Sequence, residues 1–206
     1  MRVMTRSLTL CALSVGIVLF GAACQKPPTQ EIEAAKAALE EARQSDAREY
    51  APEALDNVNQ QYAALEAELQ TQEEKMAFRR KYDQAKTMAT SVQTQAEQAK
   101  TTGAQAKEAM KTQVETALQE ASVKLEQVKM AVANAPKGKG SAADIKMMEQ
   151  DVAEMEANMA SAQQMYDAGQ YKSAMTKMQS LMASMNETQM AIESASTMQA
   201  KARAGN

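Results

Sequence analysis

Apolar residues recur at alternating intervals of three and four along nearly the whole chain after residue 30, and this spacing limits the fold more than any other feature. It places the apolar side chains on one face of an α-helix, and when sustained over many turns it is typical of coiled coils. Proline, which breaks helices, occurs only four times in 206 residues. The pattern therefore predicts an all-α fold, an elongated, coiled-coil-like helical bundle.

Residues that favour helix ends divide the chain into five expected helices. Thr29 can cap the first helix, and Pro52 suits the first turn of the second. The third is expected from about Arg80 to Pro136, which is about 55 residues and roughly 80 Å of helix. Ser141 opens the fourth helix in the manner of a capping box, and a fifth helix follows.

The boundary between the second and third helices is weakly marked, because neither Gly nor Pro lies between Met76 and Tyr82. We infer a turn there from Gly169, which occupies the equivalent place later in the chain and ends the fourth helix. The alternative is one unbroken helix from Pro52 to Asn134.

The two halves of the chain match each other in the same order, which predicts an internal duplication of a unit of roughly 90 residues. Segments of the first half recur in the second at nearly constant shifts of 86, 90 and 89 residues. The pairs are residues 32–43 with 118–129, residues 55–69 with 145–159, and residues 76–87 with 165–176. The second pair superposes Leu55, Val58, Tyr62, Leu65 and Leu69 on Ile145, Met148, Val152, Met155 and Met159.

This duplication predicts two tandem three-helix units, spectrin-like in arrangement, that share the long central helix. The first unit spans residues 29–103 and the second spans residues 104–203, with residues 204–206 as a disordered tail. Gly103 is the expected weak place of the shared helix, because glycine costs about 1 kcal/mol relative to alanine in a helix interior.

Residues 1–23 have the features of a secretory signal. Arg2 and Arg6 precede an uncharged apolar stretch that is shorter than the roughly 20 residues of a spanning helix. Small residues at 21–23 lead directly to Cys24, and this ending resembles the lipobox of bacterial lipoproteins. The resemblance implies a diacylglycerol thioether and an N-acyl chain on Cys24. The alternative is ordinary signal cleavage that leaves Cys24 as an unmodified thiol.

The same resemblance indicates where the protein is held. Gln25, rather than Asp, after the cysteine suits sorting to the outer membrane of a Gram-negative cell, with the protein on the periplasmic face. Several acyl chains would hold it firmly, since one chain alone binds only marginally. Residues 24–28 are then the lipidated cysteine and a short extended spacer, because Pro27 and Pro28 favour an extended backbone.

The composition excludes several classes of function. Removing residues 1–23 takes away two arginines and no acids, so the net charge falls from −3 to about −5, which argues against nucleic acid binding. The chain has no histidine, and no cysteine follows Cys24. Hydrolase triads, Cys–His pairs and histidine-based metal sites therefore cannot form, and we expect a protein that is not an enzyme and has no cofactor beyond the lipid.

The motifs Y-A-P-E-A-L at residues 50–55 and K-Y-D-Q-A at residues 81–85 are similar to those of a family of bacterial envelope lipoproteins. That family shares an alanine-rich helical domain of unknown function, and the resemblance covers about residues 32–109. It implies a helical protein that faces the envelope, and it implies no activity. We interpret Tyr50 and Tyr82 as packing residues at helix starts, the alternative being contact with a peptide or glycan.

Methionines are concentrated in the second half, where eleven of the 17 lie after residue 140. Thioether sulfur binds Cu(I) and Ag(I), so a soft-metal site is one hypothesis. Methionine also fills gaps in helical cores, and Met148, Met155, Met159, Met178 and Met185 fall at expected core positions, which favours packing. An adaptable client-binding surface is a third possibility. The soft-metal candidates are Met155, Met159, Met178, Met182 and Met185.

These features together predict a non-catalytic, periplasm-facing outer-membrane lipoprotein. We expect it to be a helical spacer or adaptor that binds envelope proteins or peptidoglycan, with self-association through its helices left open. The alternative function is a methionine-rich soft-metal or client-binding chaperone of the periplasm.

Overall fold

The computed structural model describes residues 26–135 and 142–204, and within these ranges it contains α-helices and one 3₁₀ helix but no strand. The expected all-α class is confirmed. The elements are α1 (Thr29–Gln44), α2 (Ala47–Tyr50), α3 (Pro52–Glu73), η1 (Ala77–Arg79), α4 (Asp83–Ala133), α5 (Ala142–Asp167) and α6 (Tyr171–Ala204).

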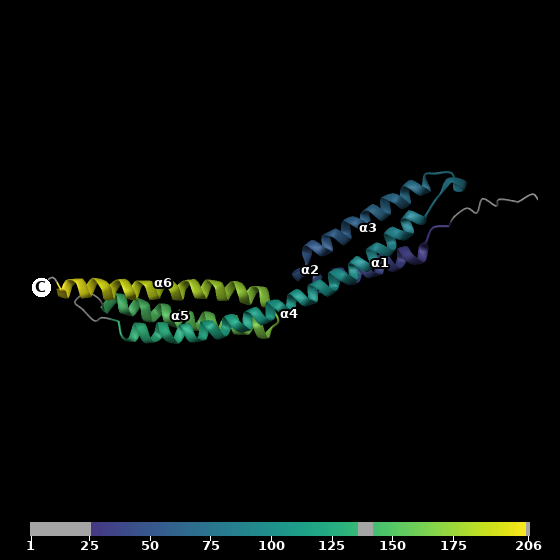
Figure 1. Cartoon of the computed structure of the whole chain (residues 1–206). Coiled ribbons are helices and arrows are strands. Elements are labelled where there is room, and N and C mark those ends of the chain that lie inside the picture. The colour runs from purple at the N-terminus through teal and green to yellow at the C-terminus, as the bar shows by residue number, and fades with distance from the viewer. Residues whose placement is uncertain (1–25, 136–141, 205–206) are drawn as a thin grey trace, which may run out of the picture.

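Helix α4 is the long central helix, and its presence confirms that expectation. It has 51 residues, which corresponds to a length of about 77 Å at 1.5 Å per residue. In Figure 1, α1 and α3 lie along the first half of α4, while α5 and α6 lie along its second half. The molecule is therefore elongated, and the start of α1 lies at the opposite end from the end of α6.

A turn separates α3 from α4, so the expected turn is confirmed and the alternative of one unbroken helix is wrong. This turn contains neither Gly nor Pro, and hydrogen bonds between side chains and the backbone stabilise it. The buried Gln72 accepts a hydrogen bond from the backbone N–H of Lys81 at 3.0 Å. The Arg80 guanidinium donates to the carbonyl oxygens of Lys75 and Glu73, at 3.0 and 2.8 Å, and so satisfies the end of α3.

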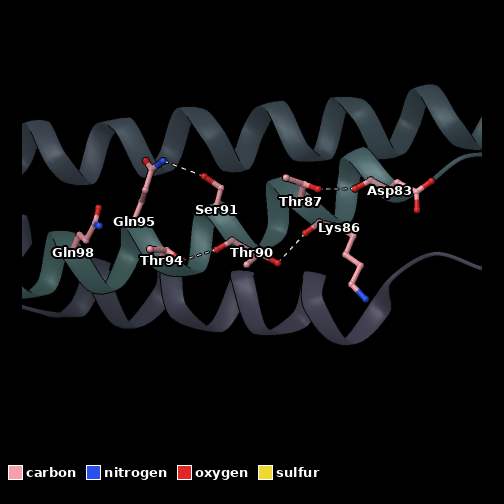
Figure 2. Close-up of a pocket in the computed structure, with 8 residues that line it drawn as sticks. All are labelled: Asp83, Lys86, Thr87, Thr90, Ser91, Thr94, Gln95 and Gln98. Carbon is pink, nitrogen blue, oxygen red and sulfur yellow. Dashed lines mark hydrogen bonds between the residues drawn. The ribbon is translucent and has the colours of Figure 1, made fainter.

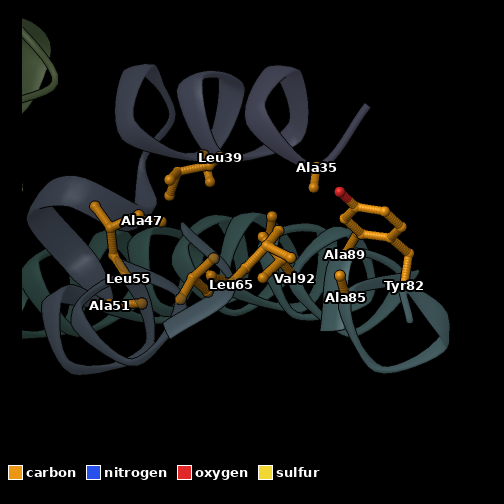
Figure 3. Close-up of a cluster of buried hydrophobic side chains, with 14 residues drawn as sticks. Ala35, Leu39, Ala47, Ala51, Leu55, Leu65, Tyr82, Ala85, Ala89 and Val92 are labelled. Carbon is orange, nitrogen blue, oxygen red and sulfur yellow. The ribbon is translucent and has the colours of Figure 1, made fainter. Parts of the chain in front are cut away.

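The first half of α4 packs against α1, α2 and α3 through a core made mostly of alanines, which we call the N-terminal core (Figure 3). Small side chains let the helix backbones approach closely, with larger residues such as Leu39, Leu65 and Val92 filling the spaces between them. The core consists of Ala35, Leu39, Ala42, Ala47, Ala51, Leu55, Val58, Leu65, Tyr82, Ala85, Ala89, Val92, Ala96 and Ala99.

The second half of α4 packs against α5 and α6 through larger side chains, which we call the C-terminal core. Its buried residues include three of the candidate methionines. They are Val114, Leu118, Ala121, Leu125, Val128, Val132, Met155, Ala162, Ala174, Met178, Leu181, Met185 and Ile192.

The helix ends agree with the sequence in part. Pro52 begins α3, and Gly169 follows α5 with a φ of 75°, both as expected. The N–H groups of Gly169 and Gln170 donate to the carbonyl oxygens of Tyr166 and Met165, the hydrogen-bond pattern of a Schellman motif. The expected Thr29 cap is wrong, because Thr29 lies inside α1 and Pro28 precedes it without a side-chain cap. Ser141 lies outside the described residues.

The four-residue helix α2 was not expected. Ser45 links it to α1, because its Oγ donates to the Ala42 carbonyl at 2.7 Å and accepts from the Ala47 N–H at 3.2 Å. Helix α2 ends at Tyr50, and only Ala51 lies between it and Pro52, where α3 begins. Helix α2 therefore lies across the reversal between α1 and α3.

Candidate functional site

Cys24, the predicted lipidation site, lies outside the described residues. Thr29 follows Cys24 by five positions, and that length of chain spans at most about 18 Å. An ion pair of 2.9 Å between Glu31 and Lys86 joins the first turn of α1 to the start of α4. The start of α1 therefore lies at the end of the molecule where α4 begins.

An open groove of about 710 Å³ runs along the first half of α4, and its lining side chains are mostly hydroxyls and amides. Figure 2 shows these side chains on α4, with a neighbouring helix on either side. Asp83 and Lys86 lie at one end of the groove. The uncharged lining residues are Thr87, Thr90, Ser91, Thr94, Gln95 and Gln98.

The threonine hydroxyls of this groove are oriented by their own helix. Those of Thr87, Thr90 and Thr94 each donate to the carbonyl oxygen four residues earlier, at 3.0 to 3.1 Å. Their hydrogens are thereby used, and their lone pairs remain as acceptors. Gln95 donates to Ser91 Oγ at 3.1 Å and accepts from Gln61 of α3. The groove therefore suits a ligand rich in N–H or O–H donors, such as a glycan or an extended peptide.

A second feature is the contact between α2 and the middle of α4, which we call the junction. Gly103 is buried there inside the continuous α4. A Cβ placed on Gly103 would lie 2.4 Å from the nitrogen of Ala47, 2.5 Å from its Cα and 2.8 Å from the carbonyl carbon of Asp46. The backbones thus touch, and only glycine permits this approach. The expectation that Gly103 weakens the helix is replaced by a packing role.

Charged groups on the surface of the junction connect α2 to both neighbours. Lys107 of α4 pairs with Asp46 at 2.8 Å, and this hydrogen bond raises the pKa of Lys107 above its usual value. Lys172, near the start of α6, donates to the backbone carbonyl of Glu49 and lies 5.3 Å from the centre of the Tyr50 ring. A cation over an aromatic face is attracted by it. These contacts tie α6 to α2, across sequence separations of more than 120 residues.

Two further tyrosines lie beside the junction. The rings of Tyr166 and Tyr171 lie 5.4 Å apart, centre to centre, with an angle of 52° between them. The Tyr166 hydroxyl donates to the Glu115 carboxylate of α4. That hydrogen bond favours the protonated phenol and raises the pKa of Tyr166 to about 12. The turn between α5 and α6 is thereby joined to α4.

The soft-metal candidates lie in the C-terminal core. Met155, Met178 and Met185 are buried, with Met185 wholly inaccessible to solvent. Met159 and Met182 are partly buried and pack against the same core. Thioether groups in these positions contact apolar neighbours, as gap-filling methionines do. Met155, Met159, Met178 and Met185 lie in or against the core as expected, and Met182, which was not expected there, also packs against it.

Tyr50 and Tyr82, both expected to be packing residues, differ in their surroundings. Tyr82 is 3% exposed in the N-terminal core, so its packing role is confirmed, as Figure 3 shows beside Ala35 and Ala85. Tyr50 is half-buried at the end of α2, where burial raises the pKa of its phenol above the usual value. It belongs to the junction, a site that sequence reasoning missed. The available signal was a glycine inside an otherwise alanine-rich helix.

Within residues 26–135 and 142–204, the carboxylates form no cluster of three or more that could hold a metal ion. Over the same residues, no helix is both long and apolar enough to cross a bilayer.

Comparison with known proteins finds no family model, no curated protein and no solved structure that matches this chain.

Proposed function

We propose that the protein is a non-catalytic, periplasm-facing lipoprotein of the outer membrane that acts as a helical spacer or adaptor. The observation that carries the proposal is the arrangement around α4. Helix α4 is continuous over 51 residues, and the expected attachment point lies at the end where it begins. Helices α5 and α6 lie along its other half. A rod attached at one end presents its long sides, and its far end, to components away from the membrane.

The finer architecture proposed is two tandem three-helix units with coiled-coil-like packing, related by duplication. Several equivalent positions in the two halves have similar burial, which supports this reading. Ala85 and Ala174 are both 0% exposed, and Leu65 and Met155 are both buried. Tyr82 immediately precedes α4, just as Tyr171, its counterpart, begins α6. The separate N-terminal and C-terminal cores along α4 are consistent with one core for each unit.

The junction supports a spacer role because it resists bending between the halves. A single α-helix that joins two packed regions would flex where its sides are uncovered. Here the close contact at Gly103 and the Lys107–Asp46 pair hold α2 against α4 at that point, and Lys172 of α6 contacts Tyr50 at the end of α2. A stiff rod keeps a fixed distance between the membrane and whatever it binds.

The groove on α4 is the proposed contact for peptidoglycan or for an extended peptide segment of an envelope protein. Its acceptor oxygens and amides match the hydroxyl and N–H donors that both ligands carry. Its length along the rod axis suits an extended chain better than a compact small molecule. No reaction is proposed there, because the groove offers hydrogen-bonding groups and no activated nucleophile.

The methionine-based alternative has less support, because the sulfur-bearing side chains of Met155, Met178 and Met185 are used in packing. Competition against a chromogenic Cu(I) chelator tests it directly. If these methionines only pack in the core, we expect no Cu(I) binding tighter than millimolar. Tighter binding would support the soft-metal hypothesis.

Site-specific photo-crosslinking in cells tests the proposed function. A photoreactive residue replaces Gln98 in the groove, and a matched variant carries it at Gln113, an exposed position on the same helix outside the groove. The proposal predicts crosslinks to peptidoglycan fragments or to a stoichiometric envelope protein at Gln98 alone. The crosslinks should be lost when Cys24→Ser releases the protein from the membrane. Equal crosslinking at both positions, or crosslinks only between copies of this chain, would contradict the adaptor role.

A further inference from the structure

The segment between α3 and α4, residues 75–81, has an unusual composition for this acidic chain. Its sequence is K-M-A-F-R-R-K, with four basic residues and no acid. We call this segment the tip. The nearest acids, Glu73 and Glu74 behind it and Asp83 beyond it, belong to the adjoining helix ends. The outermost part of this end of the rod is therefore locally cationic.

Two large apolar side chains of the tip are in contact with solvent. Met76 is 66% exposed and Phe78 is 62% exposed, and Phe78 is the only phenylalanine after residue 23. The Arg79 guanidinium lies 5.7 Å from the centre of the Phe78 ring. Within the described chain, Lys75, Arg79 and Lys81 form no ion pair. The tip thus exposes apolar and cationic groups side by side.

The tip is held in shape rather than left as a loose loop. Arg80 donates to the carbonyls of Lys75 and Glu73, and the buried Gln72 accepts from the Lys81 N–H. The 3₁₀ turn of η1 lies between these braces and carries Phe78. Because the braces fix both ends of the tip, docking would cost little ordering of the backbone.

The position of the tip identifies its occupant. It lies at the same end of the molecule as the start of α1, since Glu31 of α1 pairs with Lys86 of α4 at 2.9 Å (Figure 1). A lipid on Cys24 would keep the start of α1 within about 18 Å of the bilayer surface, at the same end of the molecule as the tip. Such a tether makes docking an intramolecular event, so a weak local affinity is sufficient.

We propose that the tip docks on the surface of an anionic phospholipid bilayer. Phe78 and Met76 enter the boundary between headgroups and acyl chains, while Lys75, Arg79 and Lys81 contact lipid phosphates. This contact would act together with the lipid anchor to orient the long axis of the rod away from the membrane. The inference rests on the proposed anchorage for its orientation, and on the tip's own residues for its chemistry.

The test uses the lipidated protein reconstituted into vesicles of phosphatidylglycerol and phosphatidylcholine, or of phosphatidylcholine alone. An environment-sensitive dye is attached to Ala77→Cys, which leaves Met76 and Phe78 intact, and to Ala200→Cys in α6 as the matched control. Docking predicts that the dye at 77 reports an apolar setting and is quenched by lipid-borne quenchers only on the anionic vesicles. The dye at 200 should report water on both.

A charge variant provides the second measurement. Lys75→Gln, Arg79→Gln and Lys81→Gln together leave Arg80, and so the brace of α3, in place. At about 1 kcal/mol per basic residue near an anionic surface, the docked fraction relative to the undocked should fall on the order of 100-fold. A Met76→Ser and Phe78→Ser variant should also abolish burial of the dye.

Failure of docking and failure of anchorage give different results. Protein that floats with vesicles while the dye at 77 stays in water on the anionic vesicles would overturn the docking inference. Equal burial on both kinds of vesicle would overturn its anionic specificity. Protein that does not float with phosphatidylcholine vesicles would contradict the anchorage. In that case the unanchored protein is titrated with anionic vesicles, and the dye at 77 is read in the same way.

Discussion

Replacing Gly103 with alanine gives the sharpest test of how the rod is built, because two interpretations predict opposite signs. If Gly103 were only a weak place in α4, alanine would stabilise the helix by about 1 kcal/mol. In the structure, however, the new Cβ would lie 2.4 Å from the Ala47 nitrogen. Ordinary contact begins near 3.4 Å, so α2 would have to move by about 1 Å.

The expected magnitude follows from that displacement. Forcing extra volume into a packed contact costs about 1–3 kcal/mol, and the cost lies toward the upper end here because the obstructing atoms are backbone. Moving α2 also uncovers Ala47 and Ala51, which are 0% and 7% exposed. After the helix gain is subtracted, we expect Gly103→Ala to lower the free energy of unfolding by about 1–2 kcal/mol. The corresponding fall in Tm is roughly 2–8 °C.

Urea unfolding followed by circular dichroism measures the change, with hydrogen exchange at residues 47–51 as the local readout. Thr102→Ala is the matched control, because Thr102 is exposed on the same turn and gains helix propensity without a new contact. It should be slightly stabilising. A Gly103→Ala protein as stable as the Thr102→Ala protein, with unchanged exchange in α2, would refute the reasoning.

Three further substitutions test the C-terminal core, the tyrosine beside the junction and the turn before α4. Met185→Ala should lower the free energy of unfolding by about 2–5 kcal/mol because Met185 is wholly buried, whereas Met182→Ala, at a partly buried position, should cost clearly less in the same urea titration. Glu115→Gln should move the pKa of Tyr166 from about 12 back toward 10, measured by tyrosinate absorbance against pH. Because that pKa is raised on folding, the associated stability is present below pH 10 and is lost as the pH rises through about 12. Gln72→Ala should cost about 1–3 kcal/mol, since it leaves a backbone N–H of the turn without its acceptor, and exchange of that amide should rise.

The helices themselves could be predicted from the sequence because burial follows the spacing of apolar residues. The buried positions Leu55, Val58 and Leu65 of α3 lie where the alternation of three and four places them. Pro52 and Gly169 also lie at helix ends as expected, because each suits the backbone conformation needed there. Local patterns of this kind depend on one helix at a time, and one sequence is enough to read them.

The features that could not be predicted depend on contacts between distant segments. The role of Gly103 is set by Ala47, which lies in a different helix, so helix propensity alone gave the wrong interpretation. Helix α2 depends on hydrogen bonds of Ser45 that no spacing reveals. The tip was expected only as a turn, because exposure of Phe78 and its place at the same end as α1 require the packed structure.

The central claim is that the protein stands as a stiff rod on the membrane, and energy transfer to the bilayer tests this most directly. A donor dye is placed at Ala77→Cys near the start of α4 or at Ala200→Cys near the end of α6, with acceptor-labelled lipid headgroups in anionic vesicles that carry the lipidated protein. Since α4 alone is about 77 Å long, the account predicts strong transfer from position 77 and little from position 200. Equal transfer from both positions would mean that the rod lies flat on the bilayer, and it would contradict the account.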